Sequence, residues 1–291
     1  MTRFLVTACC ALAVVGASGV AAADESPSAA QIVEKNVAAR GGAAAWRAVQ
    51  TLKFEGEMDA GGKPPHTLPF VLREKRPHKS RLEISFRDQA AVQVFDGAQG
   101  WKWRPYLNRA EVEAFSAEEV KEAASADDLD GPLIDHAAKG TQVALVGKDT
   151  VEGHPTWKLA LTAKSGAKRN LWVDAGTYLE VKMDGEPRKL DGKVHSTAIF
   201  FRDYRAEHGL VIPHLQETTV VGTKFPAAKM TIAKVAVNEA MEETLFQKPQ
   251  AVMTPPAAPP AADAAAAPAP VAKPAGKPVA KPSAPPAPKQ P

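Results

Sequence analysis

The sequence predicts a mainly β protein of the α+β class, built on one curved antiparallel sheet of about eleven or twelve strands. Short segments follow one another in which apolar and polar side chains alternate, as where Leu82 and Ile84 alternate with Arg81 and Glu83. Glycines fall between these segments at the short intervals expected of antiparallel turns. An amphipathic helix comes before the first strand, and the alternating body has the length of a single all-β domain.

The first 23 residues predict a cleaved signal peptide and therefore an exported protein. Arg3 gives a positive start, residues 4–20 are almost wholly apolar or small, and three alanines come before Asp24. Retention as a membrane anchor is the alternative, and the glycines within the run disfavour it. The processed protein is expected outside the cytoplasm, with no stable transmembrane segment left.

Both cysteines, Cys9 and Cys10, lie inside the predicted signal peptide. Its removal leaves no disulfide and no thiolate ligand. The residues before Cys9 resemble a bacterial lipoprotein cleavage box, but processing there would leave an apolar segment too short for a signal, so lipidation of Cys9 stays a minor alternative.

Residues 249–291 predict a disordered tail made mainly of Pro, Ala and Lys. The tail and Arg3 carry the positive charge of the chain, which is +3 overall, so the body is close to neutral and gives no electrostatic case for nucleic acid. A solubilising spacer is the simplest role for the tail. Contact with an envelope protein or with anionic cell-wall polymer is the alternative.

The first elements expected in the body are two helices. Ser28 and Gln31 have the spacing of a capping box, and Ile32, Val33 and Val37 form an apolar stripe that ends at Gly41 and Gly42. A second helical piece is expected over residues 43–49, where Trp46 lies.

Twelve strands are expected, five before a break in the pattern and seven after it. They cover residues 51–58, 66–75, 79–87, 91–96, 100–104, 142–151, 156–163, 169–174, 178–183, 195–204, 210–221 and 229–237.

Two short helices are expected in the break. Ser116 and Glu119 form a second capping-box spacing that opens a helix through Ala124, and residues 127–138 offer another. Helices placed midway through a run of strands are expected to cross the open side of the sheet. Between residues 118 and 125 only Val120 is apolar and larger than alanine, which predicts loose docking.

No catalytic or metal-binding signature is present, and no cofactor is expected. The seven histidines are scattered singly, without the spacing of a metal site. If Gly131 is aligned with the invariant glycine of a calcium-binding loop, alanines fall at two of the loop's strongest ligand positions. Isolated carboxylates such as Glu55, Glu57, Glu83 and Asp174 leave an unrecognised acid–base site as the enzymatic alternative.

The large apolar side chains are the remaining lead, because a curved sheet with few helices has more concave apolar surface than the helices can fill. Alternation alone does not decide which of two neighbours, such as Leu171 and Trp172, faces inward. The candidate cavity-wall residues are Phe54, Phe70, Leu82, Ile84, Phe95, Trp101, Trp103, Trp157, Leu159, Trp172 and Phe200.

Several segments, taken together and in order, resemble the LolA-like periplasmic lipoprotein-sorting carriers over nearly all of residues 24–248. They are Ala39 to Gly42 with Trp46 and the strand at 51–56, Val94 to Gly97 with Gly100 and Trp101, Leu171 to Asp174 with Tyr178 and Leu179, Phe201 to Tyr204, Gly209 to Pro213, and Phe246.

The resemblance implies an incomplete antiparallel barrel in which helices form a lid over an apolar cavity for acyl chains. The lid would be the helices within residues 116–138, with Val120, Leu129, Leu133 and Ile134 as its apolar residues. The implied function is non-enzymatic binding of lipoprotein acyl chains or other lipid in outer-membrane lipoprotein sorting. A structural or stress-sensing interaction module of the envelope with the same fold is the alternative.

Overall fold

A computed structural model describes residues 26–60, 66–87, 89–105, 109–125, 128–190 and 192–251, which all belong to one compact unit. The predicted signal peptide and almost all of the predicted tail lie outside the described residues. Within those residues, no helix is both long and apolar enough to span a membrane.

Helix α1, Ala29–Ala39, begins at the predicted capping box. The Ser28 hydroxyl accepts from the Gln31 backbone N–H, and the Gln31 side chain accepts from the Ser28 N–H at 2.8 Å. The helix stops two residues before Gly41, which has φ +104° and lies so close to the Gly209 carbonyl that a Cβ would clash with it. Helix α2, Ala43–Arg47, follows directly.

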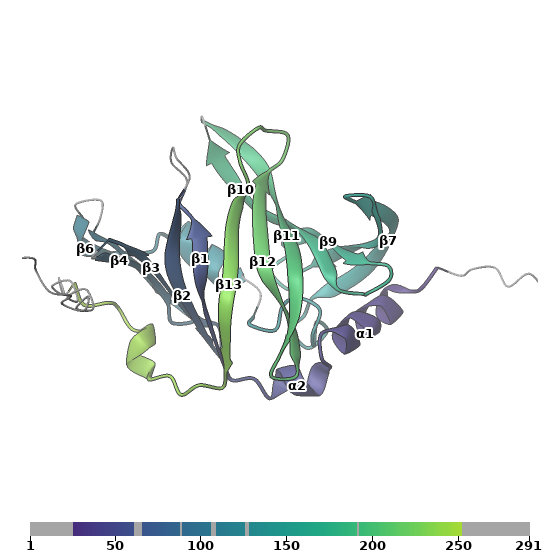
Figure 1. The fold of residues 1–291 in the computed structure, drawn as a ribbon, viewed down its shortest axis with the longest axis horizontal. Helices are drawn as coiled ribbons and strands as arrows, with labels where there is room; N and C mark the ends of the chain where they lie inside the picture. Colours follow the sequence, from purple (N-terminus) through teal and green to yellow (C-terminus); the bar gives the residue numbers. More distant parts are fainter. Residues whose placement is uncertain are drawn as a thin grey trace, which may run out of the picture. The chain divides into compact units, whose positions relative to one another are not determined.

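The described residues form a thirteen-stranded antiparallel sheet that does not close, which confirms the predicted incomplete barrel (Figure 1). Its order is β6-β5-β4-β3-β2-β1-β13-β12-β11-β10-β9-β8-β7. The strands are β1 Thr51–Asp59, β2 Thr67–Lys75, β3 Lys79–Phe86, β4 Gln89–Phe95, β5 Gly100–Arg104, β6 Arg109–Ala114, β7 Gln142–Val151, β8 His154–Thr162, β9 Lys168–Asp174, β10 Glu180–Leu190, β11 Lys193–Glu207, β12 Leu210–Val220 and β13 Ala228–Val237.

Strand β6 is the one that the alternation pattern missed. Its sequence contains a single large apolar residue, Val112, so it shows no apolar face. It forms a strand because it pairs with the otherwise free edge of β5.

Because β6 and β7 are the two edges of the sheet, the chain between them has to cross its open side. Helix α3, Ala117–Ser125, starts this connection at the second predicted capping box, where Ser116 and Glu119 exchange hydrogen bonds. The helix expected over residues 127–138 is absent from the described part, and turns occupy residues 129–140 instead. Pro132 follows Gly131, and Gly131 and Asp135 both have positive φ, which is incompatible with a continuous helix. We call residues 128–140 the crossing segment.

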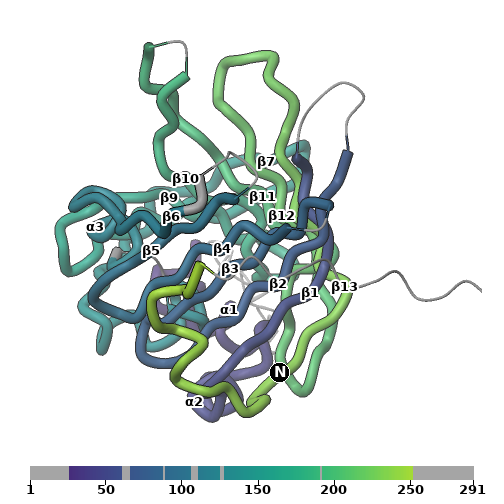
Figure 2. Tube along the Cα trace, turned by 90° about the vertical axis from the view of Figure 1, so that its left-hand side faces the viewer, coloured from purple at the N-terminus to yellow at the C-terminus, as the bar shows by residue number. Residues whose placement is uncertain are grey.

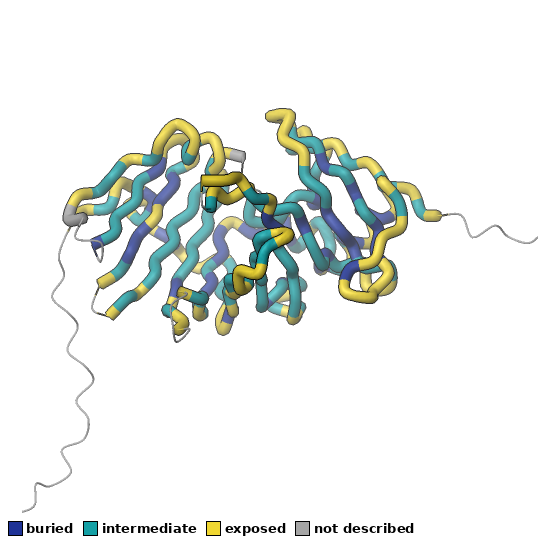
Figure 3. The backbone as a smooth tube through the Cα atoms, turned by 90° about the horizontal axis from the view of Figure 1, so that it is seen from above, coloured by how far each residue is buried: buried dark blue, intermediate teal, exposed yellow. Residues whose placement is uncertain are grey.

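The apolar core lies on both faces of the sheet. On the inner face, which meets the crossing segment, α1 packs against β8 and β9, and α2 packs near β1 and β12. On the outer face, the 3-10 helix η2, Glu243–Phe246, covers β4 and β5. Figure 2 shows this C-terminal stretch running across the outside of the first strands. In Figure 3, seen from above, dark buried stretches run through strands of both halves of the sheet.

Candidate ligand cavity

A cavity of about 350 Å³ lies between the inner face of the sheet and the start of the crossing segment. This volume falls at the low end of the range of roughly 300–1,000 Å³ found for small-molecule sites. The apolar residues in its wall are Trp46, Phe54, Leu72, Leu129, Pro132, Leu171, Met183, Ile199, Phe201, Ile212, Pro213, Met230 and Ile232. Six polar side chains complete it, namely those of Arg40, Glu74, Asp128, Glu180, Tyr204 and Gln216.

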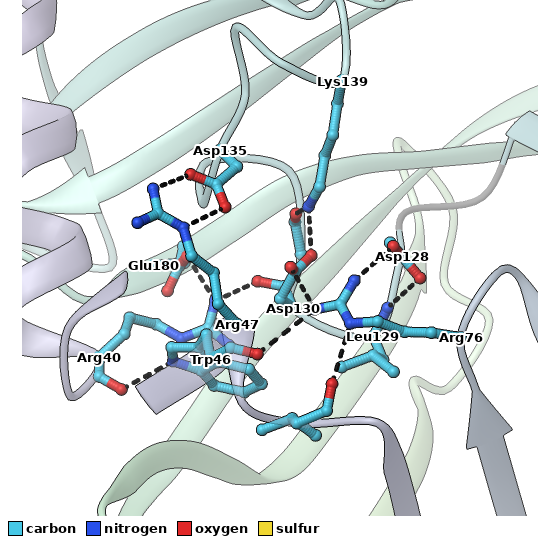
Figure 4. Close-up of polar contacts among 12 residues, drawn as sticks. Arg40, Trp46, Arg47, Arg76, Asp128, Leu129, Asp130, Asp135, Lys139 and Glu180 are labelled. Carbon is cyan, nitrogen blue, oxygen red and sulfur yellow. Dashed lines mark hydrogen bonds and ion pairs between the residues drawn. The ribbon is translucent and has the colours of Figure 1, made fainter. Parts of the chain in front are cut away.

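One end of the cavity holds a buried polar cluster whose charges are matched (Figure 4). Arg40 donates to Glu180 at 3.1 Å, and its guanidinium lies 4.5 Å from the centre of the Trp46 ring. The Tyr204 hydroxyl donates to the Glu180 backbone oxygen at 2.9 Å. Burial and the neighbouring Glu180 carboxylate hold the pKa of Tyr204 well above its ordinary value, so this tyrosine stays neutral.

The crossing segment is fastened by charge across the top of the cavity (Figure 4). Arg76, just after β2, lies 2.7 Å from the Asp128 carboxylate and 2.6 Å from that of Asp130. Lys139 pairs with Asp130 as well and donates to the Gly131 carbonyl at 2.9 Å. At the more exposed end, Arg47 of α2 pairs with Asp135.

Two apolar side chains anchor the same segment. Leu133 packs with the residues under α1, and Ile134 packs with the residues around α2, and both are fully buried. Of the predicted lid residues, Leu129 lines the cavity, whereas Val120 lies half-buried on α3. The crossing segment is therefore docked by ion pairs and apolar anchors, while α3 contributes the Lys102–Glu119 pair to the sheet.

Glu74, on the inner face of β2, is the charged group of the cavity that lacks a partner. Within the described part of the chain its carboxyl makes no hydrogen bond, and Asp128 is its charged neighbour. Burial, with a smaller contribution from the Asp128 carboxylate, raises the pKa of Glu74 to about 7. An apolar cavity thus contains a carboxyl group that titrates near neutral pH.

Some predicted wall residues lie on the inner face, as expected. Phe54 lines the cavity. Phe70, Leu82 and Ile84 join the same apolar cluster from β2 and β3. Phe95 lines a small neighbouring hollow with Glu74 and Leu129. Trp157 and Leu159 pack beneath α1 rather than in the cavity wall.

The other four predicted wall residues lie on the outer face of the sheet. Trp101 and Trp103 pair with Val94 and Val92 and pack around Met241 and Phe246. The indole N–H of Trp172 donates to Asp149, and Lys182 lies over both the Trp172 and Phe200 rings. These four assignments are corrected: the alternation was recognised, but the wrong one of its two faces was chosen.

Three of the residues that line the cavity are direct neighbours of predicted wall residues. Leu171 precedes Trp172, and Ile199 and Phe201 flank Phe200. Choosing the largest aromatic side chains directed the prediction to the wrong face. Alternation alone gave no signal that the neighbouring positions face the cavity.

The carboxylates considered for acid–base chemistry are engaged in ion pairs or turns, apart from Glu57, which accepts from a threonine hydroxyl. Glu83 pairs with Arg73 and Arg81, and Glu55 pairs with Lys53. Asp174 accepts hydrogen bonds from the turn after β9. Among the described residues, no three His, Cys, Asp or Glu side chains form a group that could hold a metal ion.

Comparison with solved structures identifies the fold. A LolA superfamily protein from Nitrosomonas europaea is 11% identical and superposes with a TM-score of 0.52, covering 77% of this chain and 99% of its own. A putative outer membrane lipoprotein-sorting protein domain from Vibrio parahaemolyticus is 15% identical, with a TM-score of 0.50 and 75% and 95% coverage. A DUF1329 family protein from Desulfovibrio piger is 14% identical, with a TM-score of 0.52 and 75% and 97% coverage. No family model and no curated protein matches the sequence.

The chain therefore has a LolA-like fold. At these identities the likeness concerns the fold alone, as the sequence resemblance had indicated for residues 24–248.

Proposed function

We propose that this protein binds a single acyl chain, from a lipoprotein or another lipid, in the cavity beneath the crossing segment, as a non-enzymatic carrier of the periplasm. The observation that carries the proposal is the cavity itself, whose wall is made largely of aliphatic and aromatic side chains from seven strands and the crossing segment. Each methylene buried there contributes about 0.8 kcal/mol, so part of a chain is enough to offset the ordering cost of binding.

The polar groups support a ligand with a polar end. The Arg40–Glu180–Tyr204 cluster is paired within itself and adds no net charge to the wall, which suits hydrocarbon. Glu74 lines the cavity together with Asp128 and Leu129 of the crossing segment, and its carboxyl, unpartnered among the described residues, is available to a polar head group. Outer-membrane lipoprotein sorting, the role named for the Vibrio parahaemolyticus domain of the same fold, would use such a site for the acyl chains of a lipoprotein.

A second candidate is an envelope interaction module of the same fold whose cavity stays closed. The ion pairs of Asp128 and Asp130 with Arg76 favour it, because they hold the crossing segment over the cavity. In this case a protein would dock on the outside of the molecule and the cavity would carry no cargo.

Native mass spectrometry of the protein purified from its own envelope distinguishes the two candidates. The carrier is expected to retain lipid, and the closed module is expected to retain a protein partner and no lipid. Ile199→Trp introduces a bulky indole ring into the cavity and is expected to abolish lipid retention, with Met230→Trp as a second variant of the same kind.

The matched control is Phe200→Trp, one residue along the same strand and on the outer face. It adds a similar ring without entering the cavity, so lipid retention is expected to match that of the unmodified protein. Equal retention by the folded Ile199→Trp, Met230→Trp and Phe200→Trp variants would contradict the proposed location of the ligand.

A further inference from the structure

Two hairpins extend beyond the rest of the sheet in the same direction, and they carry exposed apolar side chains. They are the turn regions of β10–β11 and β12–β13, which project side by side in Figures 1 and 2. Val194 is 73% exposed, Val221 54% and Phe225 50%. Three of the four large apolar residues that are exposed in the described chain lie on these two tips.

The strand register places two of these side chains on one surface. Thr197 pairs with Val220, and the Val221 N–H donates to the Ser196 carbonyl, so the ladder continues to Ser196 opposite Val221. Val194 lies two residues beyond Ser196 and therefore on the same face as Val221. Phe225 comes next in the adjoining loop, where its N–H donates to the Thr223 hydroxyl. The three side chains belong to neighbouring tips rather than to separate parts of the surface.

The same tips are basic, although the body as a whole is close to neutral. Arg188, Lys189 and Lys193 lie on the first hairpin and Lys224 on the second, and no carboxylate partner is found for them among the described residues. Glu186 and Asp191 are the acids of these two turn regions, and Asp191 lies outside the described residues. The tips therefore combine unpaired cations with apolar side chains that reach into solvent.

We propose that the β10–β11 and β12–β13 tips dock on an anionic lipid bilayer, with Val194, Val221 and Phe225 entering the interface and the surrounding lysines and arginine facing acidic head groups. Apolar side chains ringed by basic residues are the composition of interfacial membrane anchors. Two narrow hairpin tips offer little of the flat area of about 800 Å² per partner that a stable protein interface needs, whereas a fluid bilayer adapts to them. This docking surface is separate from the cavity and does not depend on the cargo of the cavity.

Flotation of the exported, full-length protein with vesicles tests the proposal. Binding is expected to vesicles of phosphatidylcholine with phosphatidylglycerol, to be much weaker with phosphatidylcholine alone, and to fall as salt is raised. The triple variant Val194→Ser, Val221→Ser, Phe225→Ser is expected to lose at least about tenfold in vesicle affinity. Lys193→Glu combined with Lys224→Glu is expected to weaken binding comparably.

The matched controls are Val146→Ser, which removes an equally exposed valine on β7, and Lys168→Glu, which reverses an exposed charge at the start of β9. Both are expected to float like the unmodified protein. The basic tail is the same in every variant, so binding through the tail alone would leave the triple variant unchanged, and that result would overturn the proposal. Absence of flotation with anionic vesicles would overturn it too.

A direct readout of insertion is available because the only cysteines are Cys9 and Cys10. With both replaced by serine, an environment-sensitive dye attached at Val194→Cys or Phe225→Cys is expected to shift to the blue on adding anionic vesicles. The same dye at Val146→Cys is expected to stay unshifted. Equal shifts at the tip and control positions would contradict insertion of the tips.

Discussion

The Arg76 guanidinium lies 2.6 Å from the carboxylate of Asp130, a side chain that is almost completely buried. One residue from the β2–β3 connection thereby fastens the chain that joins the two open edges of the sheet. The same carboxylate also pairs with Lys139, so Asp130 balances two cations. The position of the crossing segment over the cavity depends on this junction.

Asp130→Asn is therefore expected to destabilise the protein strongly. It leaves Arg76 and Lys139 without their shared buried carboxylate, and breaking a buried pair from one side costs on the order of 3 kcal/mol. Urea unfolding measures the loss. Arg47→Gln breaks the exposed Arg47–Asp135 pair and is expected to cost much less, because solvent screens this pair. Similar costs for the two variants would contradict the structural role given to Asp130.

The apolar anchors of the crossing segment are expected to matter as much as its charges. Leu133→Ala and Ile134→Ala each remove a fully buried side chain, at an expected cost of about 2–5 kcal/mol in the free energy of unfolding. Val146→Ala at an exposed position is the control, with an expected change within about 0.5 kcal/mol. Hydrogen exchange over residues 128–140 should accelerate in both anchor variants, and unchanged exchange would show that the segment is held in another way.

Glu74 gives the stability of the protein a specific dependence on pH. Its pKa is about 7 in the folded protein against an ordinary 4.5, so the folded state binds the proton more tightly. The free energy of unfolding is therefore expected to fall as pH rises from about 4.5 to 7, by at most about 3 kcal/mol. Glu74→Gln should remove this fall, as followed by urea unfolding at a series of pH values.

Glu243 is a control for Glu74, because its pKa is shifted in the opposite direction. Lys75 and Lys79 lower the pKa of Glu243 to about 2, so its contribution is present above the ordinary pKa and is lost as the pH falls toward 2. Glu243→Gln is expected to change the free energy of unfolding only in the pH dependence below about 4.5. A loss of the neutral-pH slope in Glu243→Gln rather than in Glu74→Gln would refute the assignment to Glu74.

The stability of the protein is expected to depend on the packing of η2 against the outer face of the sheet and not on the tail beyond it. Phe246 is buried against β4 and β5, and Phe246→Ala should cost about 3–5 kcal/mol in thermal or urea unfolding. Truncation after Ala251 removes only residues outside the described part and is expected to leave the unfolding midpoint unchanged. A large loss of stability on truncation would contradict the prediction that the tail is a spacer.

Local sequence rules identified the elements because those elements are set by local physics. Two capping boxes formed as predicted at Ser28 and Ser116, and twelve of the thirteen strands lie within a few residues of their predicted bounds, although β10 and β11 run longer. The missed strand, β6, has no apolar face, so its pairing with β5 comes from the tertiary arrangement alone. The helix expected at residues 127–138 failed because Gly131, Pro132 and the positive φ of Asp135 turn the chain.

The candidate site was less predictable, since alternation defines two faces without saying which one is enclosed. Phe54 lines the cavity, whereas Trp172 and Phe200 lie on the opposite face from Leu171 and Ile199, which line it. The partners of Asp130 were equally hidden, because Arg76 lies more than fifty residues away in the sequence.

By itself, therefore, the sequence determined a sheet of alternating strands preceded by a capped helix, since hydrophobic period and capping act over a few residues. Only the tertiary structure decided which face of that sheet is concave, which aliphatic residues enclose the cavity and which ion pairs hold the chain across it. Those features depend on how strands far apart in the sequence, such as β1 and β13, pair to build the sheet, and no short stretch of the chain contains that information.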